Sequence, residues 1–347
     1  MKLPEKFFVL NWTKYLKKFL VLLGSIMLIL VVNIILGVSL VRFNVFPNIK
    51  SFWVTTSMTT FTHQYLAKIV ATDSEIEKIL SENRVEDNNQ VVDKSLISIK
   101  DDQVSLGGKL VATPIEDKVE LVDFSTKEYK AHMFIVTNPR RIKLAVSKTL
   151  GKSGTKLNTL IKESNGIGGV NAGGFGDSGG HGNGGIPTGL VIKDGKVVWK
   201  DDKVNSYNII GFDRDSVLIL GNYTIDQMMK LGIQDGISFG PNLIVNGEPT
   251  KIVGDGGWGI NPRTAIGQKP DGTILLLIID GRQVSSVGAT IREVQNIMLS
   301  YGAINAANLD GGASTVIYYN NKLINKPCSS YGERPLPNAW IITAPSQ

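Results

Sequence analysis

The chain has 347 residues, enough for one large domain or two modest ones, and its formal net charge is +6. Its lysines and arginines are scattered, no basic stretch is interleaved with aromatic residues, and no helix-turn-helix or RNP-like string is present. We therefore expect no nucleic-acid partner. A basic exterior also suits an anionic wall polymer or a lipid surface.

The N-terminus contains a segment long enough to cross a membrane. Residues 19–41 form an uncharged run of 23 residues, which is longer than the apolar core of a signal peptide and lacks a small-residue cleavage site. Five lysines and one glutamate precede this run, so the positive-inside rule predicts that residues 1–18 are cytoplasmic. We expect a single-pass protein of the cell membrane, with a transmembrane signal-anchor at 19–41 and an extracytoplasmic functional domain.

Residues 42–83 are predicted to form a helical stalk, because their apolar residues recur at helical spacing and Ser74 with Glu77 can close a capping box. Residues 84–105 are mostly polar and lack periodicity, which is typical of a linker. The chain has one cysteine, Cys328, so the exported domain must be held by its own core and not by an internal disulfide. No sequence signature of a catalytic thiol surrounds Cys328.

From about residue 106 the chain changes to short apolar runs of β type punctuated by glycine, and KDGK and VNGE carry hairpin-turn dipeptides. Three helices are expected, near 155–164, at 225–231 and at 291–301. The second and third have capping boxes at Thr224–Gln227 and Thr290–Glu293 and end at glycines. The pattern predicts an α/β domain over 106–347, with α+β as the alternative and a strand-rich mixed sheet.

The string GDSGG around Ser178 also surrounds the nucleophile of chymotrypsin-like proteases. A triad of that type needs His, Asp and Ser in chain order, and the only aspartate between His132 and Ser178 is Asp177. A nucleophile elbow needs a helix after the serine, whereas HGNGGIPTG follows here. We therefore do not expect Ser178 to be a nucleophile.

Three glycine-rich strings, GFGDSG, GHGNGG and GDGGWG, match the G-x-G-x-x-G pattern of dinucleotide-binding proteins. None of them opens a helix, so the helix N-terminus that would bind a pyrophosphate is missing. The glycine-rich stretch at 171–187 is better interpreted as a loop beside a site.

Two carboxylates are predicted to converge. The apolar run TILLLIID is typical of a strand buried on both faces, and a helix and a second strand, AINAANLD, follow it. Such a βαβ unit makes its two strands parallel, and ligands bind at the carboxyl ends of parallel strands. Asp280 and Arg282 end the first strand and Asp310 ends the second. Asp-Gly pairs are also common turn residues, but two such pairs at adjacent strand ends, together with an arginine, favour a site.

Several motifs in this region resemble the phosphodiester glycosidases, the family related to the lysosomal uncovering enzyme. The resemblance is carried, in family order over roughly 165–345, by VNAGGF, GIPTGLVIKDGK, NPRTAIG, LLIIDGRQ, NLDGGAST and GERPLPNAWII. NAGGF stands where NGGFF is expected. The resemblance implies hydrolysis of the bond between the anomeric carbon of a sugar and a phosphodiester oxygen. With the extracytoplasmic location, we expect this bond to belong to a cell-envelope glycan or exopolysaccharide.

The resemblance and this chemistry together suggest roles for individual residues. Asp310 is the expected principal carboxylate, Asp280 the second and Glu333 a weaker candidate. Arginine suits the anionic phosphodiester, which it can bind with two parallel hydrogen bonds. The expected substrate-binding residues are Asn171, Gly173, Gly174, His181, Arg263, Thr264, Arg282, Gly311 and Gly312.

No cofactor is expected, because His132 and His181 are the only histidines of the domain and cannot form a histidine-rich zinc site. Oxygen-only binding of Ca²⁺ or Mg²⁺ through Asp280, Asp310 or Asp255 stays an alternative. The expected partners are a carbohydrate phosphodiester or a wall glycopolymer, and the membrane; the sequence predicts no oligomeric state. Two other functions stay open: a non-catalytic protein that binds an envelope glycopolymer, and a transferase of glycosyl or glycosyl-phosphate groups.

Overall fold

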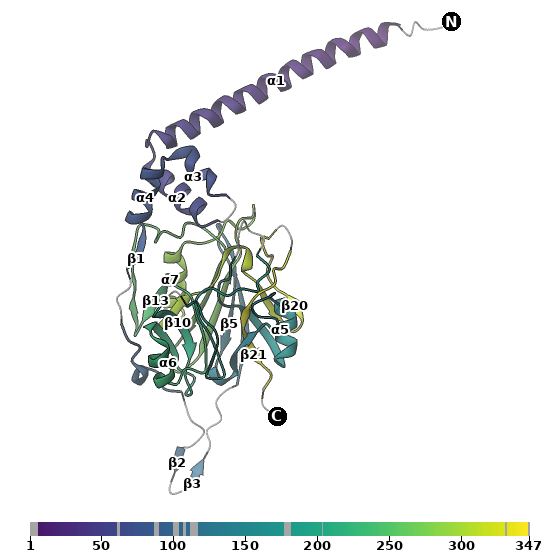
Figure 1. Cartoon of the computed structure of the whole chain (residues 1–347). Coiled ribbons are helices and arrows are strands. Elements are labelled where there is room, and N and C mark those ends of the chain that lie inside the picture. The colour runs from purple at the N-terminus through teal and green to yellow at the C-terminus, as the bar shows by residue number, and fades with distance from the viewer. Residues whose placement is uncertain are drawn as a thin grey trace, which may run out of the picture.

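The computed structural model describes residues 6–60, 63–86, 90–99, 104–106, 109–111, 117–176, 182–202, 204–329 and 332–345. Helix α1 (Lys6–Arg42) extends away from the rest of the chain, and three short helices lie between its end and a strand-rich domain (Figure 1). The stretch Trp12–Arg42 of α1 is long and apolar enough to span a membrane.

The three short helices α2 (Pro47–Met58), α3 (Tyr65–Val70) and α4 (Asp73–Glu82) form a small bundle, as expected for the stalk. Helix α4 begins at a capping box in which the Thr72 hydroxyl accepts the Glu75 N–H and the Glu75 carboxylate accepts the Thr72 N–H. The predicted box at Ser74 and Glu77 is therefore wrong by two residues, because Thr72 is the residue with extended backbone before the first turn. The buried apolar core of the bundle, which includes the end of α1, consists of Val41, Val54, Ala67, Val70, Ala71 and Ile76.

The largest sheet of the domain has seven strands, and each neighbouring pair is antiparallel. The six residues of its strand β17 are all completely buried, as predicted for the run ILLLII. In spatial order the strands are β14 (Glu248–Pro249), β13 (Asn242–Val245), β18 (Asn305–Asn308), β16 (Arg263–Gln268), β17 (Ile274–Ile279), β5 (Lys130–Val136) and β4 (Val119–Ser125).

Two five-stranded sheets pack against the seven-stranded sheet. Both hairpin dipeptides in the sequence are turns with positive φ: Asp194 and Gly195 join β8 to β9, and Asn246 and Gly247 join β13 to β14. One sheet has the order β11 (Leu218–Tyr223), β10 (Tyr207–Phe212), β12 (Asp235–Ser238), β8 (Val191–Lys193), β9 (Lys196–Trp199). The other has the order β20 (Lys322–Leu323), β19 (Ile317–Tyr319), β7 (Gly166–Asn171), β21 (Asn338–Thr343), β6 (Ile142–Val146).

The main hydrophobic core lies between these sheets and draws residues from all three, including Phe134, Ile210 and Trp340. Helix α7 (Ile291–Ser300) covers the other face of the seven-stranded sheet, and α5 (Leu157–Glu163) packs on β6 and β21. The capping boxes predicted before α6 (Ile225–Leu231) and α7 are confirmed.

The unit β17–α7–β18 places its two strands parallel, because both are antiparallel to β16. The two strands are not adjacent, which corrects the prediction from the sequence: β16 lies between them. Their carboxyl ends still lie at the same edge of the sheet, together with the first residues of β16. This edge carries Asp280, Arg263 and Asp310.

Part of the segment expected to be a linker packs on the domain. Strand β1 (Arg84–Glu86) pairs with β15 (Lys251–Val253), and Val92 and Ile97 belong to the main core. Strands β2 (Val104–Leu106) and β3 (Lys109–Val111) pair with each other and project from the end of the domain opposite α1 (Figure 1).

Candidate functional site

Four segments meet at the edge of the sheet where β17 and β18 end. The amide of Asp310 donates to the carbonyl of Ala172, just after β7, at 3.0 Å, and the amide of Gly312 donates to the carbonyl of Pro262, just before β16, at 3.0 Å. A Cβ on Gly312 would lie 3.5 Å from both Nη atoms of Arg282. The structure therefore brings the DGR and DGG motifs together, as the sequence predicted.

Asn171 is the centre of this junction. It is completely buried at the end of β7. Its Nδ2 donates to the carbonyl of Asp310 at 2.6 Å, and its Oδ1 accepts the Thr264 hydroxyl at 2.8 Å and the Val316 amide at 3.1 Å. Asn171 and Thr264, both expected to bind substrate, are thus hydrogen-bonded to each other. Asn171 also holds the backbone of Asp310 in place.

The two aspartates have different surroundings. Asp280 is buried, and its Oδ1 accepts Asn325 Nδ2 at 2.9 Å while its Oδ2 accepts the Lys326 amide at 3.1 Å. Asp280 therefore ties the segment at 325–326 to the end of β17. Asp310 is half-buried and is the more accessible of the two carboxylates.

The two arginines also differ. Arg263 is buried, and its guanidinium donates to three carbonyls, those of Ala289, Trp258 and Gly259, at 2.6 to 2.9 Å. Burial, reinforced by the positive charge of Arg282, lowers the pKa of Arg263 to about 9. Arg263 therefore stays charged at neutral pH and organises the loop at 258–259.

Arg282 has an exposed side chain whose position is restricted by its backbone conformation and by hydrogen bonds of its guanidinium. Its backbone lies in the left-handed region with φ of 56°, and its Nε and Nη2 donate to Asn261 Oδ1 at 3.1 and 2.6 Å. Asn261 in turn donates from Nδ2 to the carbonyl of Trp258 at 2.7 Å and to the hydroxyl of Thr59, in the loop after α2, at 2.9 Å. A fixed, exposed guanidinium is suited to bind an anionic group.

Glu333 lies where it supports the fold. Its Oε1 accepts the amide of Leu157, the first residue of α5, at 2.8 Å, and its Oε2 accepts the Tyr318 hydroxyl at 2.9 Å. Burial and the neighbouring Glu333 raise the pKa of Tyr318 to about 12. A negative charge at a helix N-terminus is stabilising, so these contacts explain Glu333 without catalysis.

The glycines after Asn171 allow close packing. The amide of Gly173 donates to Asn338 Oδ1 at 2.7 Å, and a Cβ on Gly174 would lie 2.8 Å from the Phe239 ring. Gly311 is equally tight, since its Cβ would lie 2.7 Å from the carbonyl of Pro262. Ser178 and His181 lie outside the described residues.

The structure also gives positions for the residues considered as metal ligands and as a thiol. Among the residues that it describes, no group of three or more His, Cys, Asp or Glu side chains could hold a metal ion. Asp255 accepts the hydroxyl of Thr55 in α2 and the Gly257 amide. Burial raises the pKa of Cys328 although the charge of Arg282 opposes this shift, so the thiol stays protonated at neutral pH.

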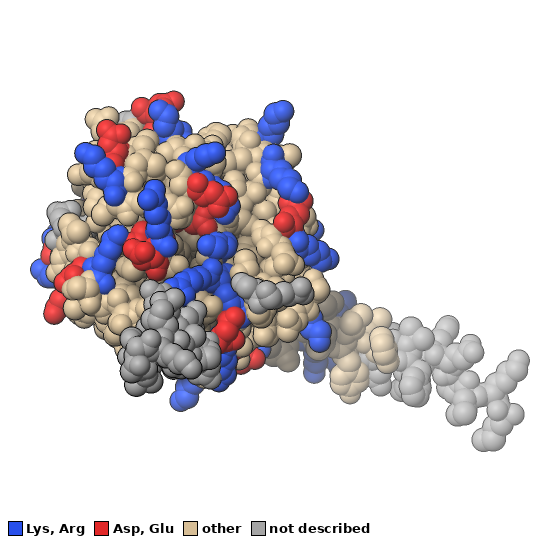
Figure 2. Space-filling view, turned by 90° about the horizontal axis from the view of Figure 1, so that it is seen from below, with Lys and Arg blue, Asp and Glu red and all other residues tan. Residues whose placement is uncertain are grey.

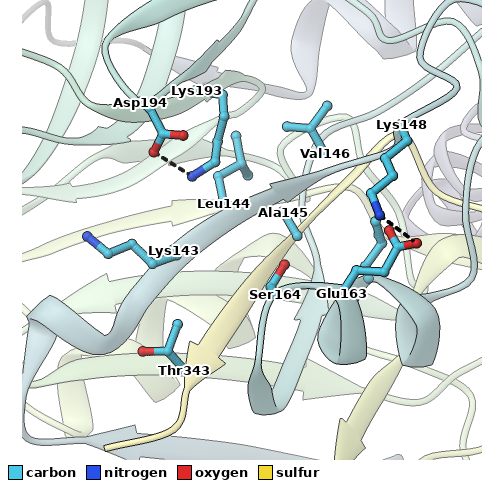
Figure 3. Close-up of a pocket in the computed structure, with 11 residues that line it drawn as sticks. Lys143, Leu144, Ala145, Val146, Lys148, Glu163, Ser164, Lys193, Asp194 and Thr343 are labelled. Atoms are coloured by element: carbon cyan, nitrogen blue, oxygen red, sulfur yellow. Dashed lines mark hydrogen bonds and ion pairs between the residues drawn. The ribbon is translucent and has the colours of Figure 1, made fainter. Parts of the chain in front are cut away.

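Two further features of the surface lie away from the junction. A cavity of about 460 Å³ is bordered by β6, α5 and the β8–β9 turn, and it contains none of the predicted site residues (Figure 3). Two of its three lysines are balanced by acidic neighbours, in the pairs Lys148–Glu163 and Lys193–Asp194. On the face shown in Figure 2, basic and acidic side chains are interspersed, a pattern unlike a nucleic-acid-binding surface.

Sequence reasoning missed two residues of the junction, Asn261 and Asn325. Asn261 is the first residue of NPRTAIG, so the motif itself was a signal for it. Asn325 binds Asp280 and the carbonyl of Thr315, and nothing in the sequence around it indicates this role.

Comparisons with known proteins agree with this geometry. Residues 164–343, more than half of the chain, match the family model described as phosphodiester glycosidase. The SPbeta prophage-derived uncharacterized protein YomE of Bacillus subtilis (strain 168) is 30% identical over 244 residues, which is 67% of this chain and 37% of that protein. N-acetylglucosamine-1-phosphodiester alpha-N-acetylglucosaminidase of Bos taurus is 37% identical over 68 residues, 20% of this chain and 13% of that protein.

The chain thus spans well under half the length of either relative. The catalytic domain of the zebrafish N-acetylglucosamine-1-phosphodiester alpha-N-acetylglucosaminidase has a similar fold, with a TM-score of 0.54 at 21% identity over 67% of this chain and 85% of that chain. From the family match over residues 164–343 and the order of its motifs, the chain belongs to the phosphodiester glycosidase family.

Proposed function

We propose that the chain is a membrane-anchored hydrolase that cleaves a sugar-1-phosphodiester in extracytoplasmic cell-envelope glycans. The observation that carries the proposal is the junction itself, where a half-buried aspartate, Asp310, stands on the loop that packs against an exposed arginine, Arg282. The family match supports the reaction class. The uncharged run 19–41 of α1 and the lysines before that run support the anchoring and its orientation.

In this proposal Arg282 binds the phosphodiester and Asp310 acts at the anomeric carbon, as nucleophile or as the base that activates water. The bond between the anomeric carbon and the phosphodiester oxygen breaks, and water supplies the hydroxyl of the free sugar. The leaving group is a phosphomonoester, whose second pKa is about 6, so it departs as an anion without needing a strong general acid. One accessible carboxylate is therefore enough.

Asp280, Asn171 and Arg263 act as positioning residues in this proposal. Their polar atoms are engaged with the protein: Asp280 with the 325–326 segment, Asn171 with Asp310 and Thr264, and Arg263 with backbone carbonyls. The alternative with Ca²⁺ or Mg²⁺ predicts that chelators abolish turnover, and the proposal predicts that they do not.

The test uses the full chain in detergent, incubated with UDP-N-acetylglucosamine and a panel of sugar-1-phosphodiesters, with free sugar followed by mass spectrometry. Asp310→Asn should lose turnover by about a hundredfold or more, since catalytic carboxylates contribute on this scale, and should keep substrate binding. The matched control is Asp226→Asn, an exposed aspartate in the first turn of α6.

Release of sugar by wild type and by Asp226→Asn, but not by Asp310→Asn, supports the proposal. Release that depends on an added glycosyl acceptor would replace the hydrolase with a transferase. Binding of a glycopolymer without turnover of any substrate would replace it with a binding protein.

A further inference from the structure

A row of exposed apolar residues follows the end of α1. Phe43, Val45, Phe46, Ile49 and Phe52 have exposed fractions between 40% and 79%. Large apolar side chains exposed next to one another on a soluble surface mark an interaction site. We call these five residues the juxtamembrane apolar face.

The spacing of residues along α2 explains why these apolar side chains are exposed together. Pro47 starts α2, and one side of the helix, with Val54 and Ser57, is buried in the stalk bundle. Phe46, Ile49 and Phe52 are spaced three residues apart, so they share a neighbouring side of the helix. The ammonium of Lys50 does not reach this side, because it turns inward to the carbonyl of Arg42 and to the Glu75 carboxylate. In the first half of α2 the exposed large side chains, Ile49 and Phe52, are therefore apolar, and Asn48 is the one exposed polar residue.

The position of α1 indicates what covers this face. The uncharged run 19–41 has 23 residues and as a helix is about 34 Å long, against roughly 30 Å for the bilayer core. Its last residues, Val38 and Val41, already pack in the stalk bundle. A bundle joined to the span without an intervening linker must sit at the membrane surface, and the face begins one residue after α1 ends.

We propose that the juxtamembrane apolar face lies in the membrane interface and holds the stalk against the lipid bilayer. The proposal rests on the proposed membrane anchoring by α1. Amphipathic helices at this position sink their apolar side about 5–10 Å into the boundary between headgroups and acyl chains. Arg42, exposed and fixed by its hydrogen bond to the carbonyl of Ile69, lies at the level where a guanidinium meets lipid phosphate.

The same helix also contacts the candidate site. Thr55 donates to Asp255, the Thr56 hydroxyl accepts the amide of Ile260 at 3.1 Å, and Thr59 accepts from Asn261. Helix α2 has 12 residues and is about 18 Å long, so the loop that holds Arg282 lies within about that distance of the bilayer surface. The site therefore works on sugar phosphodiesters presented close to the membrane.

The experiment measures membrane depth in the full chain, reconstituted at one copy per lipid nanodisc with Cys328→Ser. Single cysteines replace Phe46, Ile49 and two reference residues, and each is labelled with bimane and exposed to lipids carrying a nitroxide, at headgroup depth for positions 46, 49 and 96 and deep in the acyl chain for position 30. Leu30, in the middle of the span, reports whether α1 is in the bilayer. Leu96 is a matched control, because it is 44% exposed and lies near Ser98, which binds the β16–β17 turn at the end of the sheet away from the site.

We expect labels at positions 46 and 49 to lose several times more fluorescence than the label at 96. Quenching at 30 with emission at 46 and 49 equal to that at 96 would overturn the proposal while α1 still spans the membrane. The absence of quenching at 30 would show that the anchoring fails, and the proposal with it. Labels at 46 and 49 that are protected from soluble iodide but not quenched by nitroxide lipid would mean that protein, not lipid, covers the face.

Discussion

Replacing Asn171 with alanine tests whether this side chain holds the candidate site together. The side chain is completely buried and joins three groups: the Asp310 carbonyl, the Val316 amide and the Thr264 hydroxyl. In Asn171→Ala all three lose their partner. A buried backbone group left without a partner costs about 1–3 kcal/mol, and the Thr264 hydroxyl costs less because it can rotate toward another acceptor.

The expected loss in the free energy of unfolding is therefore about 3–5 kcal/mol. It can be measured by urea denaturation of the detergent-solubilised chain, followed by tryptophan fluorescence. Asn222→Ala is the matched control, because Asn222 is exposed on β11, and it should change stability by less than about 0.5 kcal/mol.

The reasoning is refuted if Asn171→Ala is destabilised by less than about 1 kcal/mol. That result, combined with a loss of turnover, would mean that Asn171 acts on the substrate directly and that its contacts in the fold are dispensable. Asn171→Asp adds a second check. It keeps an acceptor for Val316 but loses the N–H that binds Asp310, so it should also be destabilised.

Three further predictions concern single contacts. Asn261→Ala should raise KM for an anionic substrate by about tenfold with a smaller change in kcat, because Arg282 loses the hydrogen-bond acceptor that fixes its guanidinium. An unchanged KM would mean that Arg282 does not bind the phosphate group of the substrate. Glu333→Gln should lower the pKa of Tyr318 from about 12 toward, but not below, 10, since burial remains the larger cause; ultraviolet titration against the wild-type chain measures this shift, and no change would contradict it. The bond from Lys50, aided by the Thr72 amide, lowers the pKa of Glu75 to about 2, so the stability it gives the stalk is complete above pH 4.5 and lost as the pH falls toward 2. Thermal unfolding between pH 5 and 2 should show a larger loss of stability in wild type and in the exposed control Glu77→Gln than in Glu75→Gln, because other carboxylates with lowered pKa values, such as Glu86, remain in all three; equal losses in all three would refute it.

Much of the fold followed from local sequence. The run ILLLII is completely buried, and the capping boxes at Thr224 and Thr290 begin helices as predicted, because these signals depend on residues within one or two turns. The insertion of β16 between β17 and β18 depends on which strands pair across the sheet, and no local pattern encodes that choice. The sequence therefore predicted that β17 and β18 end at the same edge of the sheet, but not that β16 lies between them.

The candidate site was predictable to a similar extent. The motifs located Asp280, Arg282 and Asp310 at one edge of the sheet, because a carboxylate followed by glycine at the end of a strand can be recognised from the sequence alone. The partner of each polar side chain could not be recognised. Asp280 binds Asn325, 45 positions away, and Asn261 binds Thr59, 202 positions away, so the distinction between the buried Asp280 and the half-buried Asp310 required the fold.

The packed joint between α1 and the stalk bundle has a consequence for the proposed anchoring of the chain in a membrane. Val41 is buried among residues of α2 and α3, and α2 is hydrogen-bonded to the domain through Thr55 and Thr56, so the stalk bundle links the end of α1 to the domain by packed contacts and not by a flexible linker. A transmembrane helix adapts to bilayer thickness by changing its tilt. In a thicker bilayer α1 would stand more upright, and the rigid joint would rotate the edge that carries Asp310 by the same angle. Under the proposed function, lipid composition would in this way adjust the approach of the candidate site to a sugar phosphodiester without any ligand.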